Sequence, residues 1–542
     1  MYSIVKIFEV VEKSLDRIID DPKYLNNSIQ DKREKALIIL YKQNNLISQD
    51  REIIELPYFY DVIRNSKKFK DFKELLNNFE NVNIYVSNHI SLRDIYEVLM
   101  LSTSITKLDL SDRKNGNEYL EYLAPVIGKN NYINELILKN SNIDITGIKD
   151  IYKILEQNKS ITNLDLSQNH KIGSQGIKYL VPILEHNTSI TNLNLYGIGL
   201  RNEGMIYISQ ILKENKTLTT LSLSGNNIED MGIQNLTIDL QYNTSITHLD
   251  LSINKITFEC LQYLVPILII NKSIIDLNLS SNYLSNEGML YLVPFLKQNK
   301  NILSLGLAGN EITDDGIIHL ASGLKENTSI DNLDLSGNDM GIYNNIKFLL
   351  PVLSQIVTLN LSSNKLDNEC ISLLGSILEQ NTSITNLDLS YNYFGVEGME
   401  SLSKGLSKNK SIIKLDLSSN SLESDSIYYL ASAIQQNNII MEINLYRNLF
   451  GDEGAKYLIQ SLEKNTSIIE FDYGHNYIQD YLVSDIIYLL NRNKKILDDR
   501  LKLYREHKES LPHLNLSLSK SNVYIPPGTI DDFNRFMNKV QF

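Results

Sequence analysis

The side chains that could do chemistry in this chain are carboxylates that recur beside the leucines of a short Leu-x-Leu element. The residue between the two leucines is acidic in seven of the fourteen elements and basic in none. Carboxylates about 5 Å apart in one row repel one another, and a bound cationic surface would relieve this repulsion. The row therefore predicts a binding surface for a basic protein, although inheritance from a duplicated unit would also produce it. The position reads Asp109, Ile137, Asp165, Asn194, Ser222, Asp250, Asn278, Gly306, Asp334, Asn360, Asp388, Asp416, Asn444 and Asp472.

Large residues interrupt the serine-rich column that follows the second leucine. Lys139, Tyr196 and Tyr446 stand in this column, and Tyr391 and Arg447 come one place later. Tyrosine and arginine are among the residue types that most often anchor protein interfaces. Random drift would explain the same residues, so their role in binding is a hypothesis. The predicted partner-binding residues are Tyr196, Asp250, Asp334, Asp388, Tyr391, Asp416, Tyr446, Arg447 and Asp472.

No set of residues in the sequence has the spacing of a catalytic or metal site. The sequence holds no phosphate-binding glycine loop, no cluster of cysteine or histidine at metal-ligand spacing and no nucleophile elbow. His248 and His475 occur singly and are expected at the surface. Cys260 and Cys370 lie in helical stretches of different repeats, so we expect reduced thiols. The sequence therefore predicts that the protein is not an enzyme and that it has no catalytic residue, no metal and no cofactor.

These residues are positioned by a repeat that covers most of the chain. Successive elements start 28 residues apart, except for 29 residues between Leu164 and Leu193 and 26 between Leu333 and Leu359. In each unit an alternation of period two changes to an apolar spacing of 3.6, which predicts a strand followed by a helix. Because no unit buries its apolar face alone, stacked units form an α/β solenoid. The first leucine positions are Leu108, Leu136, Leu164, Leu193, Leu221, Leu249, Leu277, Leu305, Leu333, Leu359, Leu387, Leu415, Ile443 and Phe471.

An asparagine follows the second leucine by three residues in every unit from Asn226 to Asn476. At this point the chain bends out of the sheet, and a buried amide can pair the backbone groups that the bend leaves free. The first four units carry Arg113, Ser141, Asn169 and Ile198 at the same position. This departure indicates either an irregular cap or a functional site.

The repeat pattern resembles the ribonuclease-inhibitor-like class of leucine-rich repeats. The resemblance rests on Leu-x-Leu-x-x-Asn-x-Ile/Leu followed by motifs such as Asn286 to Met289, Asn202 to Met205 and Val396 to Met399, and it covers about residues 82–500. The class includes ribonuclease inhibitor, the Ran GTPase-activating proteins and the sensor arrays of NOD-like receptors. It implies a horseshoe with a parallel sheet on the concave side and helices on the convex side. Its members bind unrelated partners, so the resemblance implies no particular one.

The sequence divides into three regions. Residues 1–78 lack the repeat and are predicted to form a helical N-terminal region that caps the sheet. Residues 79–500 form an array of about 14 to 15 units, with a degenerate first unit near Val82, and residues 501–542 form a C-terminal cap and tail. Tyr481 to Asn491 is expected to complete the last repeat helix, and Lys495 to Lys508 to form a second, charged one.

Charge and composition narrow the setting and the partners. A net charge of −13 disfavours nucleic acid, and no apolar stretch reaches the roughly 18 to 20 residues of a membrane span. The amphipathic N-terminus lacks the features of a secretory signal. The triplets at Asn187, Asn243, Asn327, Asn381 and Asn465 fall at one place in the repeat, so we interpret them as structural rather than glycosylated. We expect a monomer in the cytoplasm, which would be the host cytoplasm for a secreted bacterial effector.

The sequence thus predicts a protein-protein interaction scaffold that binds a protein partner through its concave surface, as an effector or a sensor. The alternative is a GTPase-activating protein of the Ran-activator type. Arg113 stands where asparagine is expected, and an arginine can stabilise the charge that develops in phosphoryl transfer. A solvated arginine in a capping repeat is the simpler interpretation of the same residue.

Overall fold

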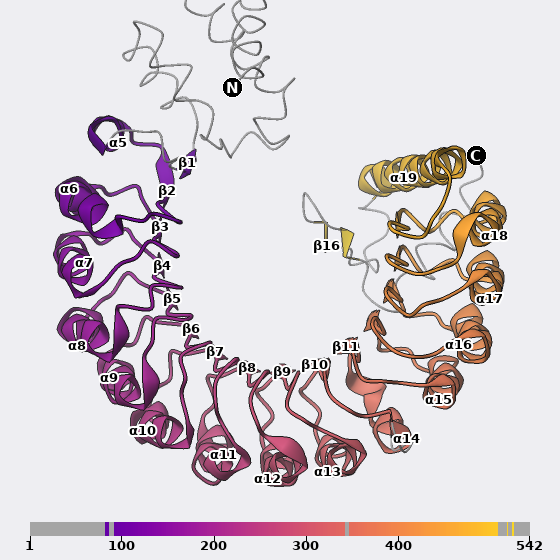
Figure 1. Cartoon of the computed structure of the whole chain (residues 1–542), viewed down its shortest axis with the longest axis horizontal. Coiled ribbons are helices and arrows are strands. Elements are labelled where there is room, and N and C mark those ends of the chain that lie inside the picture. Colours follow the sequence, from indigo (N-terminus) through magenta and orange to yellow (C-terminus); the bar gives the residue numbers. More distant parts are fainter. Residues whose placement is uncertain (1–81, 86–91, 342–345, 508–516, 519–522, 525–542) are drawn as a thin grey trace, which may run out of the picture. The chain divides into compact units, whose positions relative to one another are not determined.

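The computed structural model describes residues 82–85, 92–341, 346–507, 517–518 and 523–524. The predicted helical region 1–78 and most of the predicted tail lie outside these residues. The described chain forms two compact units, divided in the sequence between Leu249 and Asp250. In each unit the strands are parallel and the helices cover one face of the sheet, while no described helix covers the other face (Figure 1). This arrangement is the predicted α/β solenoid.

Each repeat of the first unit contributes one short strand and one helix. Its strands are β1 (Val82–Tyr85), β2 (Ile105–Asp109), β3 (Glu135–Ile137), β4 (Asn163–Asp165), β5 (Asn192–Asn194) and β6 (Thr220–Ser222), with β7 (His248–Asp250) at the division. Its helices are α5 (Leu92–Leu101), α6 (Gly116–Lys129), α7 (Ile145–Gln157), α8 (Gly173–Leu184), α9 (Arg201–Glu214) and α10 (Asp230–Leu240). The degenerate unit expected near Val82 is confirmed, because Ile84 of β1 pairs in parallel with Leu108 of β2.

The second unit continues the same pattern. Its strands are β8 (Asp276–Asn278), β9 (Ser304–Gly306), β10 (Asn332–Asp334), β11 (Thr358–Asn360), β12 (Asn386–Asp388), β13 (Lys414–Asp416), β14 (Glu442–Asn444) and β15 (Glu470–Asp472). Its helices are η2 (Phe258–Cys260), α11 (Leu261–Ile270), α12 (Ser285–Gln298), α13 (Asp314–Leu324), α14 (Ile346–Leu349), η3 (Leu350–Gln355), α15 (Asn368–Leu378), α16 (Val396–Lys408), α17 (Ser424–Gln436), α18 (Gly451–Lys464) and α19 (Asp480–His507). A separate antiparallel pair joins β16 (Ser517–Leu518) and β17 (Val523–Tyr524).

The strand leucines stack in register and form the core. Leu387, Leu415 and Ile443 are paired partners on successive strands, and all three are buried. Side chains alternate between the two faces of a strand, so the residues on either side of each leucine lie on the open face. The register therefore turns each outward position of the repeat into a continuous row across the strands.

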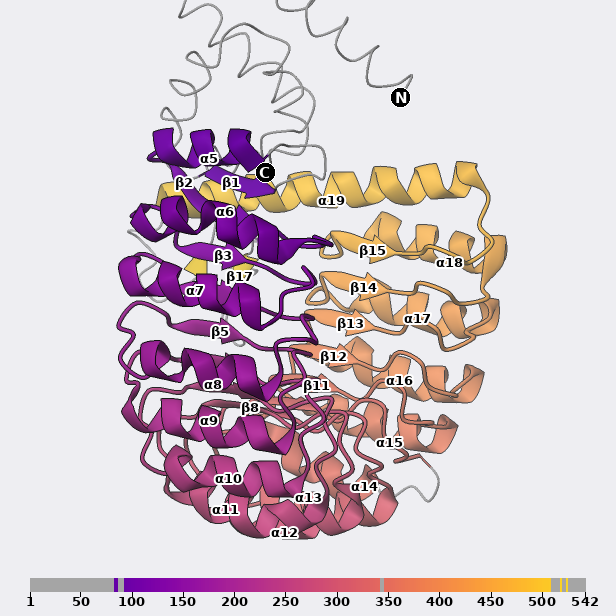
Figure 2. The ribbon, with the colours of Figure 1, turned by 60° about the vertical axis from the view of Figure 1, so that its left-hand side comes forward.

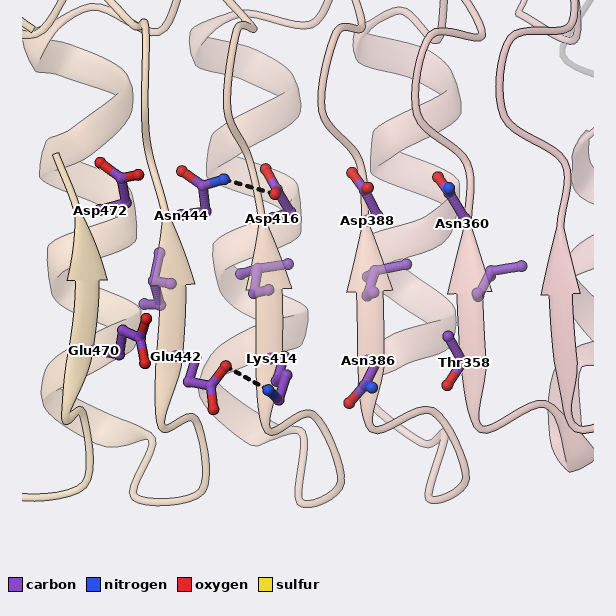
Figure 3. A pocket seen from close by; sticks show the side chains of 14 residues that line it. Thr358, Asn360, Asn386, Asp388, Lys414, Asp416, Glu442, Asn444, Glu470 and Asp472 are labelled. Carbon is purple, nitrogen blue, oxygen red and sulfur yellow. Dashed lines mark hydrogen bonds and ion pairs between the residues drawn. The ribbon is translucent and has the colours of Figure 1, made fainter. Parts of the chain in front are cut away.

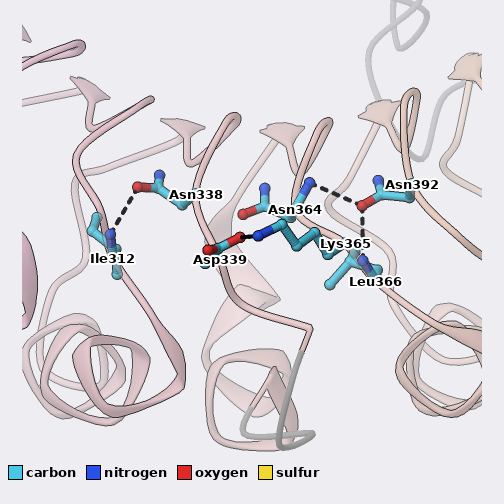
Figure 4. A network of polar contacts seen from close by, with 7 residues as sticks. All are labelled: Ile312, Asn338, Asp339, Asn364, Lys365, Leu366 and Asn392. Atoms are coloured by element: carbon cyan, nitrogen blue, oxygen red, sulfur yellow. Dashed lines mark hydrogen bonds and ion pairs between the residues drawn. The ribbon is translucent and has the colours of Figure 1, made fainter.

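The asparagine at the bend connects neighbouring repeats (Figure 4). Asn392 Oδ1 accepts the backbone N–H groups of Asn364 and Leu366 at 3.0 Å each. Its Nδ2 donates to the carbonyl oxygens of Leu361 and Leu389 at 3.1 and 3.0 Å. The predicted role of this amide is confirmed, and the structure adds that three of these four partners belong to the preceding repeat.

The ladder is irregular in the unit that is 26 residues long. Asn364 donates from Nδ2 to Leu335 O at 2.9 Å, but its Oδ1 is buried without a hydrogen-bond partner. Lys365 instead forms an ion pair with Asp339 across the two repeats (Figure 4). The short turn therefore removes the donors that an Asn364 carbonyl would meet in a regular unit.

A second asparagine row ends the helices and explains the Asn-x-Ser/Thr triplets. Asn465 Oδ1 accepts the backbone N–H of Ser467 at 2.9 Å and of Ile468 at 3.0 Å, and its Nδ2 donates to Ile434 O in the preceding repeat. Asn187, Asn243, Asn327 and Asn465 are all buried. The structural interpretation of these triplets is confirmed at these four positions, because a buried amide offers no site for a glycan.

One long helix closes the second unit (Figure 2). The sequence predicted two helices over this stretch, but α19 runs unbroken from Asp480 to His507. Arg492 donates to Leu462 O at 2.6 Å and to Asn465 O at 2.8 Å, and Asn493 donates to Ile468 O at 2.7 Å. These bonds supply the backbone partners that a next repeat would have provided, so α19 caps the last repeat.

Candidate protein-binding face

The acidic row on the open face has a structural role that the sequence did not reveal. Each aspartate of the row accepts the backbone N–H two residues later. Asp388, Asp416 and Asp472 do so from Ser390, Ser418 and Gly474, each at 2.9 Å. Asn360 and Asn444 make the same contact, to Ser362 and Tyr446. Asp and Asn thus both stabilise the turn at this position with a side-chain hydrogen bond, and each carboxylate keeps a second oxygen for other contacts.

The open face of β11 to β15 is hollowed into a shallow groove with a volume of about 430 Å³ (Figure 3). Two rows of side chains line it, one on each side of the buried central residues. The first row is Asn360, Asp388, Asp416, Asn444 and Asp472, and the second is Thr358, Asn386, Lys414, Glu442 and Glu470. Five carboxylates and one ammonium group give this groove a formal charge of −4 (five negative, one positive). We refer to it as the acidic groove.

Contacts within the acidic groove leave part of this charge unpaired. Lys414 Nζ lies 2.6 Å from Glu442 Oε2, and Asn444 Nδ2 donates to Asp416 Oδ2 at 2.7 Å (Figure 3). Burial raises the pKa of Asp388, and the neighbouring carboxylates of Asp416 and Asp334 raise it further, against the hydrogen bonds from Ser390. The charged form of Asp388 is thus disfavoured in the absence of a cation, and a bound cation would favour it.

The predicted tyrosine and arginine contacts lie at the strand-exit edge of the acidic groove. Tyr446 is half-buried, and its ring meets that of His475 edge to face, with centroids 4.9 Å apart. Arg447 and Tyr391 are exposed at the bend, both with φ of +54°. The structure therefore brings five predicted residues to one face: Asp388, Asp416, Asp472, Tyr446 and Arg447. Tyr391 lies on the same face, in the loop that follows Asp388.

The remaining predicted residues lie elsewhere. Asp334 pairs with Asn360 and sits one strand outside the acidic groove. Asp250 is the first residue of the second unit. Tyr196 belongs to the first unit, where its ring packs so close to Gly225 that a Cβ there would come within 2.5 Å of it. Tyr196 thus has a packing role within the first unit.

Arg113 is buried in the structure. Its side chain is 3% exposed, and its guanidinium lies 5.3 Å from the centroid of the Tyr119 ring. An arginine that stabilises phosphoryl-transfer charge must reach the nucleotide of another protein. The prediction that Arg113 is solvated is therefore wrong. Its burial also removes the residue on which the GTPase-activating alternative rested.

Sequence reasoning missed half of the acidic groove. Lys414, Glu442 and Glu470 precede the first leucine of their strands, and they face outward for the same reason as the residue between the leucines. The alternation along each strand predicts two outward positions, one before the first leucine and one between the two leucines. The sequence-based prediction covered only the second of them. Exposed tyrosines at Tyr393 and Tyr477 were also missed, since they follow the bend and not the strand.

The described residues offer no sign of metal or thiol chemistry. No group of three or more potential ligands gathers among them. Cys260 and Cys370 are buried and neither is in a disulfide, as the sequence predicted, and burial raises the pKa of Cys370 to about 12. A thiol with such a pKa is protonated at neutral pH and is a poor nucleophile.

Comparison with known proteins identifies the repeat type. The family model described as the MHP1/HER1/GIP3 LRR domain matches residues 100–392. No curated protein matches the sequence. A solved structure of leiomodin-1 actin-binding site 2 is similar at 21% identity, covering 30% of this chain and 95% of that chain with a TM-score of 0.27, which is too low to bear on function. No helix among the described residues is both long and apolar enough to cross a membrane.

Proposed function

Because the chain belongs to the leucine-rich-repeat family of the MHP1/HER1/GIP3 LRR domain, we propose that it is an interaction scaffold whose acidic groove binds a basic protein. Leucine-rich repeats build their open sheet face as a rigid surface for protein partners. The observation that carries the proposal is the net charge of −4 gathered on the open face of β11 to β15. Rigid, like-charged rows steer and select an oppositely charged partner.

The fold does not require this concentration of charge. Asparagine closes the strand-exit turn as well as aspartate does, as Asn360 and Asn444 show in the groove itself. Aspartate at 388, 416 and 472 therefore adds charge without adding a turn bond. The second row adds Glu442 and Glu470, of which Glu470 is exposed. A function that needs negative charge accounts for both rows, whereas turn closure accounts for only one.

We also propose a repeat class, a compartment and an oligomeric state for the chain. The 28-residue period and the helices of 10 to 14 residues in most repeats favour the ribonuclease-inhibitor-like class. The two buried cysteines, neither of which is in a disulfide, favour a reducing compartment such as the cytoplasm. An effector or sensor role would use the same surface to select its target. We propose a monomer that carries no catalytic group and binds neither nucleic acid nor a cofactor.

The test removes charge from the acidic groove while keeping its turns. The variant Asp388→Asn/Asp416→Asn retains side chains that accept the Ser390 and Ser418 N–H groups. The matched control, Asp109→Asn/Asp165→Asn, makes the same change at the same repeat position in the first unit, where Asp109 and Asp165 close equivalent turns. Each full-length protein is used to capture proteins from a cell lysate at low and high salt, with quantification by mass spectrometry.

The expected result is a basic protein that is captured at low salt by the unaltered chain and by the control. The groove variant should capture at least about tenfold less of it, since each lost charge contact in an interface costs about 1 kcal/mol or more. Capture that is equal for the groove variant and the unaltered chain would refute the acidic groove as the binding surface. Equal loss in the control would assign the effect to overall charge.

A further inference from the structure

The bend after each strand forces one residue into the left-handed backbone region. In the last repeats this residue is Tyr391, Ser419, Arg447 and His475, with φ between +53° and +57°. Earlier repeats of the second unit fill the same position with small residues in four of five cases, namely Ser281, Gly309, Gly337 and Ser363, and with Ile253 in the fifth. Any residue with a Cβ is disfavoured in this region, and a bulky one more so. The backbone therefore favours glycine here, and the large residues oppose that preference.

Burial of the side chain does not offset the backbone strain at the tyrosines. Tyr391 is 52% exposed, and Tyr477, which has φ of +59° two places further along its loop, is 82% exposed. Exposed tyrosine rings gain little from folding, since burial is the source of apolar stabilisation. Strained residues that the fold neither needs nor stabilises are concentrated at functional sites. The two tyrosines thus point to binding.

The strand-exit loops of the last four repeats hold these side chains in one line. Tyr391 N–H donates to Ser418 O at 3.0 Å, Ser419 N–H to Tyr446 O at 2.9 Å, and Arg447 N–H to Gly474 O at 2.9 Å. The loops therefore stack with the same register as the strands below them. We call the resulting surface the aromatic edge; it comprises Tyr391, Tyr393, Tyr446, Leu449, His475 and Tyr477.

The aromatic edge is continuous with the acidic groove. Asp388 closes its turn on the N–H of Ser390, which directly precedes Tyr391. Asp472 does the same with Gly474, which directly precedes His475. These two loops thus carry a carboxylate at the end of the strand and an aromatic ring three residues later, at the bend. The second unit therefore presents an acidic line and an apolar line side by side.

We infer that the aromatic edge and the acidic groove form one docking surface for a polypeptide segment that is apolar along one side and basic along the other. This inference rests on the proposed function and specifies its partner. Lysine or arginine heads would pair with Asp388, Asp416 and Asp472. Apolar side chains would cover the tyrosines, which bury large areas at low entropic cost.

The test uses substitutions that improve the backbone while removing the rings. Tyr391→Gly/Tyr477→Gly places glycine at two left-handed positions. The matched control is Ser419→Gly/Ser421→Gly, which makes the same backbone change at φ of +53° and +57° without removing a ring. The probes are two synthetic peptides, one with alternating leucine and lysine and one with alternating serine and lysine. In an extended conformation each has its lysines on one side.

Binding of both peptides to each full-length protein is measured by fluorescence anisotropy, and stability by thermal unfolding. The tyrosine variant is expected to unfold at the same or a higher temperature and to bind the leucine–lysine peptide about tenfold more weakly. Its affinity for the serine–lysine peptide should be unchanged, and the control should bind both peptides as the unaltered chain does. Unchanged affinity for the leucine–lysine peptide would overturn the inference. A lower unfolding temperature would also overturn it, because the rings would then serve the fold.

The groove variant Asp388→Asn/Asp416→Asn separates this inference from the proposed function. If the groove variant binds neither peptide while the tyrosine variant binds both with full affinity, the proposed function stands. The aromatic edge is then refuted as a binding surface. Full binding of both peptides by the groove variant would refute the acidic groove itself. If the unaltered chain binds neither peptide, both proposals fail.

Discussion

Asp388 and Asp416 are registered partners on the neighbouring strands β12 and β13, so two carboxylates face the same groove one strand spacing apart. Each closes its own turn, and neither is neutralised by the other. Their proximity raises the pKa of Asp388 beyond the effect of its burial. This relationship links the stability of the repeat array to pH and to partner binding.

A pH-dependent gain in stability is expected for Asp388→Asn. Because the folded-state pKa of Asp388 is raised above its usual 3.8, the charged form costs stability above the folded-state pKa. That cost disappears as the pH falls below the unfolded-state value. The variant should therefore be more stable than the unaltered chain near neutral pH, and the difference should vanish in acid. Urea unfolding at a series of pH values checks this, and a pH-independent difference would contradict it.

The strand-exit turn can be separated from the charge at Asp416. Asp416→Ala removes the acceptors for the Ser418 N–H and for Asn444 Nδ2 and should destabilise the chain by about 1 kcal/mol more than Asp416→Asn, which keeps the acceptor for Ser418. Both changes remove the same charge, so they differ mainly in the turn bond. The two urea-unfolding free energies give the comparison. Equal losses would show that the charge and not the turn matters for stability.

The asparagine ladder should be weaker at the short unit. Asn392→Ala leaves the N–H groups of Asn364 and Leu366 without their acceptor, and we expect a loss of about 2 to 4 kcal/mol. Asn364→Ala removes an amide whose Oδ1 already lacks a partner, so it should cost clearly less. The pair is matched in residue type and burial, and urea unfolding measures both. A larger loss for Asn364→Ala would refute the assigned role of the carbonyl oxygen.

The Tyr446–Arg447 pair should serve binding more than folding. Tyr446→Ala/Arg447→Ala removes an edge-to-face contact with His475 worth about 1 kcal/mol, so the chain should remain folded. The affinity for the basic partner should fall about tenfold or more, because tyrosine and arginine contribute more binding free energy at interfaces than most other residue types. Circular dichroism and titration calorimetry provide the two readouts. Unchanged affinity would remove both residues from the interface.

The thiols should react only after unfolding. Burial raises the pKa of Cys370 to about 12, and Cys260 is buried as well. Alkylation by iodoacetamide at about pH 8 should modify neither cysteine in the folded chain and both in denaturant, since the thiolate is the reactive form. Mass spectrometry of the intact protein counts the labels. Rapid labelling of the folded chain would show that the repeat around Cys370 opens readily.

The sequence by itself determined the features that repeat with the chain. The 28-residue period, the inward leucines and the bend asparagine follow from local alternation and from the need to bury one face of each unit. The structure confirms each of them in Leu387, Leu415 and Asn392. The outward position of Asp388 and Asp416 was predicted for the same reason, because a strand has only two faces.

Only the tertiary structure decided what depends on the stacking of repeats. The donors to Asn392 come from the preceding repeat, Arg113 is buried against Tyr119, and the short unit leaves Asn364 without its donors. The turn bonds of the acidic row and the left-handed bend at Tyr391 were equally hidden, since they depend on backbone angles. A sequence pattern specifies which face a side chain takes, but the neighbouring repeat and the path of the backbone decide what that side chain meets.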